Sequence, residues 1–154
     1  MSEWDDQYTL KIYSPGRINI IGEHLDYNGG DVLPMPIILA TQIQFAKTTG
    51  TTYEVESLQF KNMLRRELKD DHISSVKWHN YVIGVVNELL KILPHKIKGF
   101  RAIINGSIPV GAGLSSSASL TCGLLRGLNS LFDLNISKKE MALIAQKVEH
   151  HYTG

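Results

Sequence analysis

One segment rich in glycine and serine, residues 109–119, constrains this chain more than any other stretch of its sequence. It reads P-V-G-A-G-L-S-S-S-A-S. An apolar run at residues 100–104 leads into it, and leucines recur at helical spacing from residue 120 to residue 131. The order strand, glycine loop, helix is the context in which a loop binds phosphate, because free N–H groups of the helix's first turn face the anion. The alternative is a tight turn before a serine-capped helix.

The residue types of this loop suit a phosphate chain. Gly111 and Gly113 lack a Cβ, so the backbone adopts positive φ angles and approaches a bulky anion closely. The hydroxyls of Ser115, Ser116 and Ser117 can bind phosphate oxygens or a magnesium ion, which prefers hard oxygen ligands. The segment therefore predicts a phosphate site.

Composition limits the classes of protein to consider. The chain has 154 residues, of which 43% are hydrophobic and 20% charged, so we expect one globular domain. Its net charge is +1 and it has no basic stripe, which argues against nucleic-acid binding. No apolar run suits a membrane span, and the polar N-terminus differs from a signal peptide. The single cysteine, Cys122, excludes an intrachain disulfide; we expect a buried thiol and a cytoplasmic protein.

A second unusual segment, G-E-H-L-D-Y-N-G-G, occupies residues 22–30. It places Glu23, His24 and Asp26 between apolar stretches, and polar side chains held by flanking strands suggest a binding site. Asn28 and Gly29 form a strong hairpin signal. A plain hairpin turn is therefore the alternative, and the two interpretations are compatible.

The rest of the pattern predicts strands and helices in mixed order. Strands are expected at residues 8–13, 17–23, 32–47 and 52–57, the first ended by Ser14, Pro15 and Gly16. Residues 58–76 lack a clear pattern and are expected to hold a short helix and a loop, with the charged residues 61–72 on a solvated face. An amphipathic helix is expected at residues 78–93, stopped by Pro94.

A last helix is expected to open at a capping box formed by Ser137 and Glu140. Glu149 lies beside its apolar face, where a glutamate is ordinarily a solvated residue. The neighbouring His150 and His151 do not share a helix face, so we expect no zinc site. Trp78, at the start of the preceding long helix, is more often a core residue than part of a binding surface.

Three segments together resemble one family, the galactokinases among the GHMP small-molecule kinases. Residues 14–35 resemble the galactokinase signature, and residues 109–119 resemble the phosphate loop of the wider superfamily. W-H-N-Y-V-I-G-V, at residues 78–85, is similar to the helix start near the adenine pocket. The resemblance implies an α+β fold, the ribosomal-S5-like N-terminal domain of these kinases, with a mixed or antiparallel sheet and helices packed on one side.

The same resemblance implies ligands, ATP and Mg²⁺, and a role for each motif residue. The sugar hydroxyls would be held by Glu23, His24, Leu25 and Asp26. Arg17 would lie between the sugar and the γ-phosphate, where its charge stabilises developing negative charge. Magnesium would be bound by Ser116 and Glu149. The nucleotide would be held by Trp78, Gly111, Ala112, Gly113, Leu114, Ser115, Ser116, Ser117, Ala118, Ser119 and Leu120.

Two departures from the family pattern affect the expected function. Leu25 stands where typical galactokinases have threonine, as in the N-acetylgalactosamine kinase branch, so the sugar stays open. Gly154 ends the chain before the family's catalytic aspartate. We therefore expect residues 1–154 to be an incomplete N-terminal domain, inactive alone. Its parent, expected to be a monomer, would transfer the γ-phosphoryl group of ATP to the C1 hydroxyl of galactose.

Two alternatives lie outside the enzyme class. One is a non-catalytic protein that senses galactose and ATP, and the other is a truncated gene product that still folds. Sensor relatives are expected to have a damaged serine loop, and residues 115–119 are intact here, which favours the enzyme. Self-association of the fragment stays open.

Overall fold

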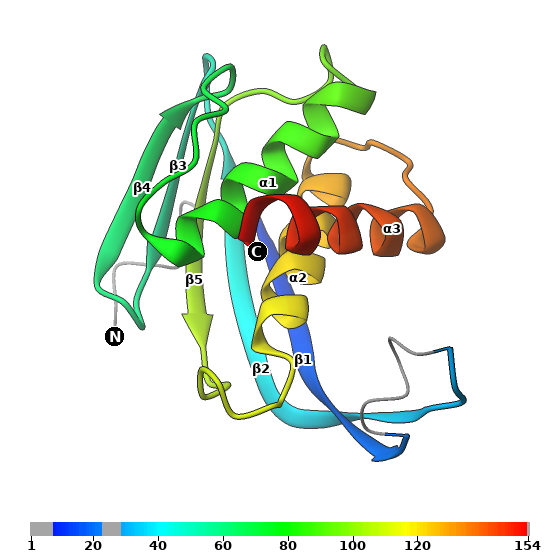
Figure 1. Cartoon of the computed structure of the whole chain (residues 1–154). Helices are drawn as coiled ribbons and strands as arrows, with labels where there is room; N and C mark the ends of the chain where they lie inside the picture. The colour runs from blue at the N-terminus through cyan, green and yellow to red at the C-terminus, as the bar shows by residue number, and fades with distance from the viewer. Residues whose placement is uncertain (1–7, 23–28, 154) are drawn as a thin grey trace.

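The computed structural model describes residues 8–22 and 29–153, and within them one five-stranded sheet carries all the helices (Figure 1). The strands are β1 (Leu10–Ile21), β2 (Leu33–Lys47), β3 (Thr52–Ser57), β4 (Asn62–Glu67) and β5 (Phe100–Gly106). The helices are α1 (Lys77–Ile92), α2 (Ser116–Leu131), α3 (Lys138–Val148) and the short π-helix η1 (Glu149–Thr153).

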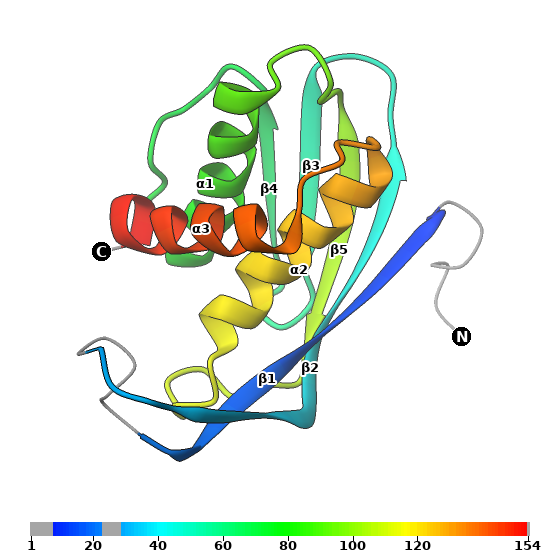
Figure 2. The same ribbon diagram turned by 90° about the vertical axis from the view of Figure 1, so that its right-hand side faces the viewer.

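The sheet is mixed, in the order β1-β2-β5-β3-β4. All neighbouring strands are antiparallel except β3 and β5, which run parallel because α1 lies in the connection between them. Figures 1 and 2 show the helices stacked on one face of the sheet. The predicted α+β fold, a mixed sheet with helices on one side, is confirmed.

The core lies between this sheet face and the helices. Side chains that alternate along the strands turn inward, among them Phe45, Tyr53 and Phe100, and all three are fully buried. The rings of Tyr53 and Phe100 stack with centroids 5.4 Å apart. Leucines of α2 and valines of α1 cover them from the helix layer. The helical spacing seen in the sequence therefore marks the faces that pack on the sheet.

The first strand is longer than the sequence predicts. Ser14, Pro15 and Gly16 do not end it; β1 continues through them with a register shift between Pro15 and Arg17. Proline is tolerated there because β1 is an edge strand, where a missing N–H removes no hydrogen bond from the sheet interior. The strand breakers of the sequence therefore mark an irregularity within one strand.

Residues 62–67 form β4, within a stretch where the sequence predicts a short helix and a loop; that expectation is wrong for these residues. β4 is the other edge strand, paired only with β3. Its one fully buried side chain is Leu64, while Arg65 and Glu67 face solvent as expected for this charged stretch. Charged residues are common on edge strands, where they discourage pairing with other chains, and they weaken the strand signal in the sequence.

Apart from the short helix expected within residues 58–76, the predicted helices are confirmed within about a turn. The capping box is present: the Glu140 N–H donates to Ser137 Oγ at 3.3 Å, and the Ser137 N–H donates to Glu140 Oε2 at 2.9 Å. The expected burial of Cys122 is wrong: the residue lies on an exposed position of α2, although neighbouring atoms partly enclose its thiol. Over the described residues, no helix combines the length and the apolar character needed to cross a membrane.

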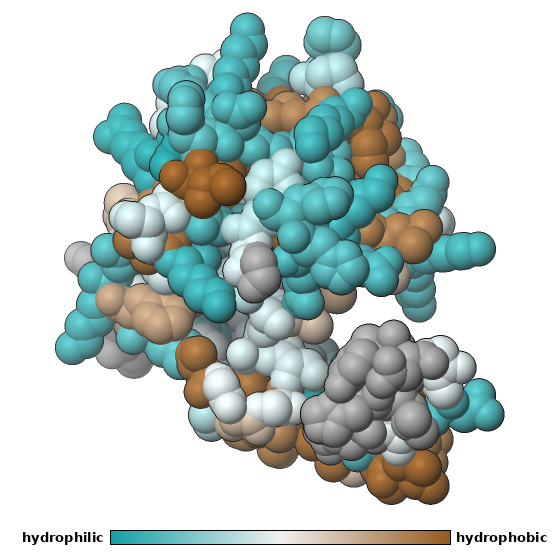
Figure 3. Space-filling model, in the orientation of Figure 1, coloured by the Kyte–Doolittle hydropathy of each residue, from teal (hydrophilic) through white to brown (hydrophobic). Residues whose placement is uncertain are grey.

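Exposed apolar side chains gather where β1 and β2 extend past the helices. They are Ile20, Ile21, Leu33, Met35 and Ile38, of which Ile38 is 89% exposed. In Figure 3 apolar surface follows the lower edge of the molecule, where these strands run. We name this group the β1–β2 apolar patch.

Candidate functional site

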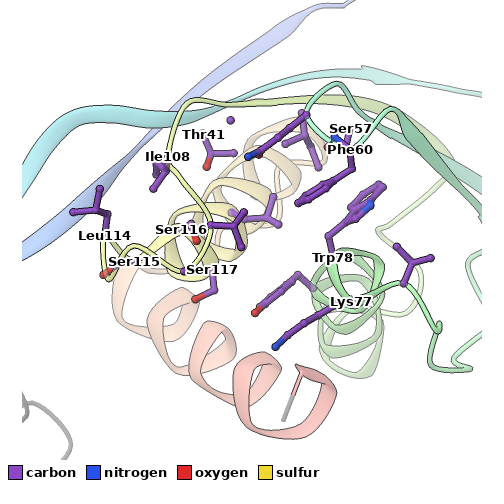
Figure 4. Close-up of a pocket in the computed structure, with 18 of the residues that line it drawn as sticks. Thr41, Ser57, Phe60, Lys77, Trp78, Ile108, Leu114, Ser115, Ser116 and Ser117 are labelled. Atoms are coloured by element: carbon purple, nitrogen blue, oxygen red, sulfur yellow. Dashed lines mark hydrogen bonds between the residues drawn. The ribbon is translucent and has the colours of Figure 1, made fainter.

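A cavity of about 670 Å³ lies between the glycine loop, the first turn of α1 and the ends of β3 and β5 (Figure 4). Its walls combine backbone, hydroxyl and aromatic groups. The lining residues include Thr41, Ser57, Phe60, Lys77, Trp78, Tyr81, Gly111, Gly113, Leu114, Ser115, Ser116, Ser117 and Leu120. The loop and the tryptophan that the sequence analysis singles out thus meet at one cavity.

The glycine loop adopts the left-handed backbone conformation that its sequence predicts. Gly111 and Gly113 have φ angles of 77° and 71°. Apart from the chain neighbours, no atom of the described residues lies within 4 Å of a Cβ built on either glycine, so the backbone conformation rather than crowding calls for glycine. Ser115 is also left-handed, at φ 59°, an uncommon conformation for a residue with a Cβ and one that is enriched at functional sites.

Ser115 is the N-cap of α2, and its side chain caps no N–H group of the helix. The serine-capped helix offered as the alternative interpretation is therefore absent here. Figure 4 shows Ser115, Ser116 and Ser117 at the cavity, where α2 begins. An uncapped helix start leaves backbone donors and the positive end of the helix dipole for an anion.

Two aromatic rings form the opposite wall of the cavity. Phe60 and Trp78 lie nearly parallel, with centroids 6.3 Å apart and planes 8° apart. Trp78 is only 6% exposed, and its Nε1 is buried without a hydrogen-bond partner among the described residues. Flat apolar walls with a spare donor suit a heteroaromatic base. Phe60 was missed by the sequence analysis, because it lies in the unpatterned stretch before β4.

Lys77 was also missed, and it is the only charged residue among the described residues that line the cavity. It makes no hydrogen bond or ion pair within the described part of the chain. In Figure 4 its side chain extends from the start of α1 toward the side of the cavity where Ser117 lies. The cavity therefore has a cation facing its glycine loop.

A polar network fixes the start of α1. Nε2 of His79 lies 2.9 Å from Asn62 Oδ1, and its Nδ1 lies 3.0 Å from Ser74 Oγ. The ring also packs edge-on against Trp78, with centroids 4.4 Å apart. Burial, together with the charge of Arg66, holds the pKa of His79 below its usual value. A neutral histidine, with one nitrogen donating and one accepting, satisfies both partners.

The segment at residues 14–35 contacts the glycine loop through β1. The Arg17 N–H donates to the carbonyl oxygen of Leu114 at 3.1 Å. The hydroxyl of Ser119 donates to the carbonyl oxygen of Ser14 at 2.6 Å and lies 2.9 Å from Thr41 Oγ1. Ser119 is buried, and these contacts give its hydroxyl a role in joining α2 to β1 and β2.

Glu149, at the junction of α3 and η1, has a buried oxygen, Oε1, that finds no hydrogen-bond partner among the described residues. A buried carboxylate oxygen without a donor is costly unless a cation or another ligand satisfies it. The same region includes Cys122: burial and the charge of Glu149 raise the pKa of its thiol, while Arg17 lowers it. Glu149, Arg17 and Cys122 therefore lie within electrostatic reach of one another.

The structure brings together most, but not all, of the predicted site residues. Trp78 and seven residues of the 111–120 segment line the cavity; Ala112, Ala118, Ser119, Arg17 and Glu149 do not. Glu23, His24, Leu25 and Asp26 lie outside the described residues. Among the described residues, no group of three or more histidine, cysteine, aspartate or glutamate side chains could hold a metal ion by itself.

Comparison with known proteins identifies the family. Residues 80–154 match the GHMP kinases N terminal domain, and residues 4–47 match the galactokinase galactose-binding signature. Residues 80–154 are therefore a GHMP kinase N-terminal domain, preceded in the same chain by the galactose-binding signature. The chain is similar to curated galactokinases: that of Clostridium perfringens is 45% identical over 150 residues, and that of Pasteurella multocida is 39% identical over 150 residues. Each alignment covers 95% of this chain and 38% of the relative, so the chain spans well under half the length of these galactokinases.

Solved structures of GHMP kinases share the fold. The galactokinase of Lactococcus lactis, complexed with galactose, superposes with a TM-score of 0.86 and 38% identity, covering 94% of this chain and 38% of that chain. The mevalonate kinase of Methanococcus jannaschii superposes with a TM-score of 0.77, covering 94% of this chain and 47% of that chain. At 23% identity, the second match shows the fold alone.

The residues present fit the ligands of a GHMP kinase. The glycine loop and the uncapped start of α2 suit a phosphate chain, and the parallel rings suit a base. Magnesium bound to a nucleotide takes few protein ligands because phosphate oxygens and waters supply the rest. Glu149 Oε1, which has no partner in the described part of the chain, and the hydroxyl of Ser116 are oxygen ligands of the kind that magnesium prefers.

Proposed function

We propose that this chain is the N-terminal domain, residues 1–154, of a galactokinase that transfers the γ-phosphoryl group of ATP to the C1 hydroxyl of galactose. One observation carries the proposal: the galactose-binding signature at residues 4–47 and the GHMP domain at residues 80–154 occur together in one chain. The cavity at the glycine loop supports it, because a site for phosphate and a base is what a kinase of this kind requires.

Each part of the cavity has a role in this proposal. Gly111 and Gly113, with the serines that follow, hold the ATP phosphates, while Trp78 and Phe60 flank the adenine. Ser116 and Glu149 bind Mg²⁺, which neutralises charge on the phosphates during transfer. Phosphoryl transfer depends chiefly on positioning and on charge neutralisation, and these residues supply both.

The proposed sugar site is formed by the segment at residues 14–35. Glu23, His24 and Asp26 hold sugar hydroxyls by side-chain hydrogen bonds. Arg17 stabilises negative charge that develops between sugar and nucleotide, and its placement near Glu149 supports this role. The group that accepts the proton of the sugar hydroxyl is an aspartate beyond Gly154, so the 154-residue chain alone is inactive.

The β1–β2 apolar patch supports a larger parent protein. Several large apolar side chains lie together and exposed, as at surfaces that other protein covers. We propose that the remaining part of the kinase covers this patch in a monomeric, cytoplasmic parent. The isolated chain then has an open apolar surface through which copies can associate.

A second candidate function is the phosphorylation of N-acetylgalactosamine. Leu25 favours it, because an apolar residue at this position of the motif resembles what kinases of that sugar have there. A galactose- and ATP-binding sensor is a candidate from another class, and the intact serines of the loop argue against it.

The test is a substrate panel with Mg·ATP, in which release of ADP is measured. The protein at its full natural length and the 154-residue chain are each assayed with galactose, N-acetylgalactosamine, glucose, homoserine and mevalonate. We expect ADP release with galactose or its N-acetyl form from the longer protein alone. Binding of sugar and ATP without ADP release would favour the sensor. Activity of the 154-residue chain would contradict the proposal that a catalytic aspartate beyond Gly154 is required.

A further inference from the structure

The π-helix η1 packs against α1 through Tyr152. A Cβ added to Gly84 would stand 2.9 Å from Cγ of Tyr152 and 2.8 Å from Cγ1 of Val148, so the ring lies directly on the helix backbone. The Tyr152 hydroxyl lies 3.2 Å from Glu88 Oε1 and 3.3 Å from Lys91 Nζ. Positions 84, 88 and 91 share one face of α1. One face of α1 therefore receives both the ring and the hydroxyl.

Glu88 gives this contact its strength. Its side chain is buried, at 6% exposure, and its Oε1 accepts a hydrogen bond from Lys91 Nζ at 2.5 Å. Burial alone would raise the pKa of Glu88, but the hydrogen bonds and charge of Lys91 and the Tyr152 hydroxyl lower it below its usual value. An ionised buried carboxylate needs such donors, so loss of the Tyr152 hydroxyl leaves it underpaired.

The backbone links this contact to the proposed metal ligand. Glu149 is the C-cap of α3 and the first residue of η1, and its N–H bonds to the carbonyl oxygens of Ala145 and Gln146. Thr153 Oγ1 donates to the Glu149 carbonyl oxygen at 3.0 Å and closes the turn. Segments of π-helix are rare and frequently occur at functional sites. Because Tyr152 lies in the same single turn as Glu149, fixing its ring fixes the backbone that carries the glutamate.

We propose that Gly84, Glu88 and Tyr152 form a positioning device for Glu149, which holds its carboxylate where it binds the magnesium ion of Mg·ATP. We name these three residues the α1 anchor. The inference rests on the proposed function, and the α1 anchor itself touches neither metal nor nucleotide. Since α1 also carries Trp78, one rigid helix sets the position of both the aromatic wall and the metal-binding glutamate.

The test measures ATP affinity by calorimetry in the presence of Mg²⁺ and in the presence of EDTA, with the protein at its full natural length. The ratio of the two affinities is the gain that Mg²⁺ provides. Groups that orient a metal ligand typically change metal affinity by about tenfold or more. In Tyr152→Phe and Glu88→Gln we expect the gain to fall about tenfold, while ATP affinity in EDTA stays unchanged. Gly84→Ala, which displaces the ring, is expected to do the same.

Two control variants separate positioning from general stability. Tyr53→Phe repeats the substitution at a buried tyrosine whose hydroxyl has no hydrogen-bond partner within residues 8–22 and 29–153. Leu131→Ala removes buried side-chain atoms at the last residue of α2, outside η1 and the α1 anchor, and lowers the melting temperature. The Mg²⁺ gain is expected to stay at the wild-type value in both.

An unchanged gain in the folded Tyr152→Phe and Glu88→Gln variants would overturn the positioning role and leave the proposed function standing. A wild-type protein that binds ATP equally with and without Mg²⁺ would overturn the magnesium site itself, and the positioning role with it. Thermal unfolding of each variant establishes that it is folded at the temperature of the titration.

Discussion

The backbone N–H of Arg17 donates a hydrogen bond to the carbonyl oxygen of Leu114 at 3.1 Å. This bond joins β1 to the glycine loop, two motifs far apart in the sequence. Gly16 lies beside it, and a Cβ on that residue would stand 2.8 Å from the same oxygen. Gly16 therefore permits the close contact that positions the glycine loop against β1.

Gly16→Ala is expected to lower the free energy of unfolding by about 1–3 kcal/mol, the usual cost of forcing extra atoms into a packed site. The added methyl group meets backbone, which cannot move away as a flexible side chain can. Gly106→Ala is the control, because its new methyl meets only the end of the Gln59 side chain. Chemical denaturation measures the free energy of unfolding of both variants. Equal stability of the two would contradict the tight contact between β1 and the loop.

Lys77→Met is expected to weaken binding of ATP by roughly fivefold, the effect of losing one partly screened charge. Binding of adenosine should not change, because Lys77 extends toward the glycine loop rather than standing in the aromatic wall. Competition titrations with adenosine, ADP and ATP measure the affinity of the variant and of the wild type for each ligand. Lys98→Met, at an exposed position outside the cavity, serves as the matched control. An equal loss for adenosine and ATP would show that Lys77 does not act on the phosphates.

Cys122 is the only cysteine of the chain and reports on the charges around it. Burial and the negative charge of Glu149 raise its thiol pKa, and Arg17 lowers it. Glu149→Gln should therefore lower the thiol pKa, and Arg17→Gln should raise it. The rate of alkylation as a function of pH measures the thiol pKa in each variant. Shifts in the same direction, or none, would show that these residues do not converge beside α2.

The stability of the start of α1 is expected to fall at acid pH because of His79. Its pKa is lowered in the folded state, chiefly by burial, so the unfolded chain takes up the proton first. The contribution of His79 is complete above about pH 6.5, its unfolded value, and is lost as pH falls through the folded value. The free energy of unfolding, measured by denaturation at several pH values from 7.5 to 5, should depend less on pH in His79→Gln than in the wild type. The exposed His95 offers a control, and His95→Gln should retain the wild-type slope.

The helices and the glycine loop could be predicted from the sequence because their signals are local. Leucine spacing, the Ser137 capping box and glycines at positive φ each act within a few residues. Edge strands lack such signals. β4 is held by pairing with β3 and by one buried leucine, and β1 runs through its proline because an edge position tolerates it.

The site was predicted less completely than the fold. Phe60 and Lys77 enter the cavity only through the packing of β4 and α1, which no short motif encodes. Ser119 belongs to the loop motif, yet its hydroxyl bonds to Ser14 and Thr41 inside the fold. Motif membership therefore indicates a segment near the ligand, while the direction of each side chain depends on tertiary contacts.

The most direct measurement is a calorimetric titration of the protein with Mg·ATP, compared between the wild type and Gly113→Val. Gly113 has a φ of 71°, a conformation that a β-branched residue adopts only with strain. The wild type should bind Mg·ATP at one saturable site, and Gly113→Val, shown by circular dichroism to be folded, should bind roughly 5-fold to 150-fold more weakly, the range that a strain of about 1–3 kcal/mol gives. Undiminished binding by the folded variant, or no saturable binding by the wild type, would contradict a nucleotide site at the glycine loop.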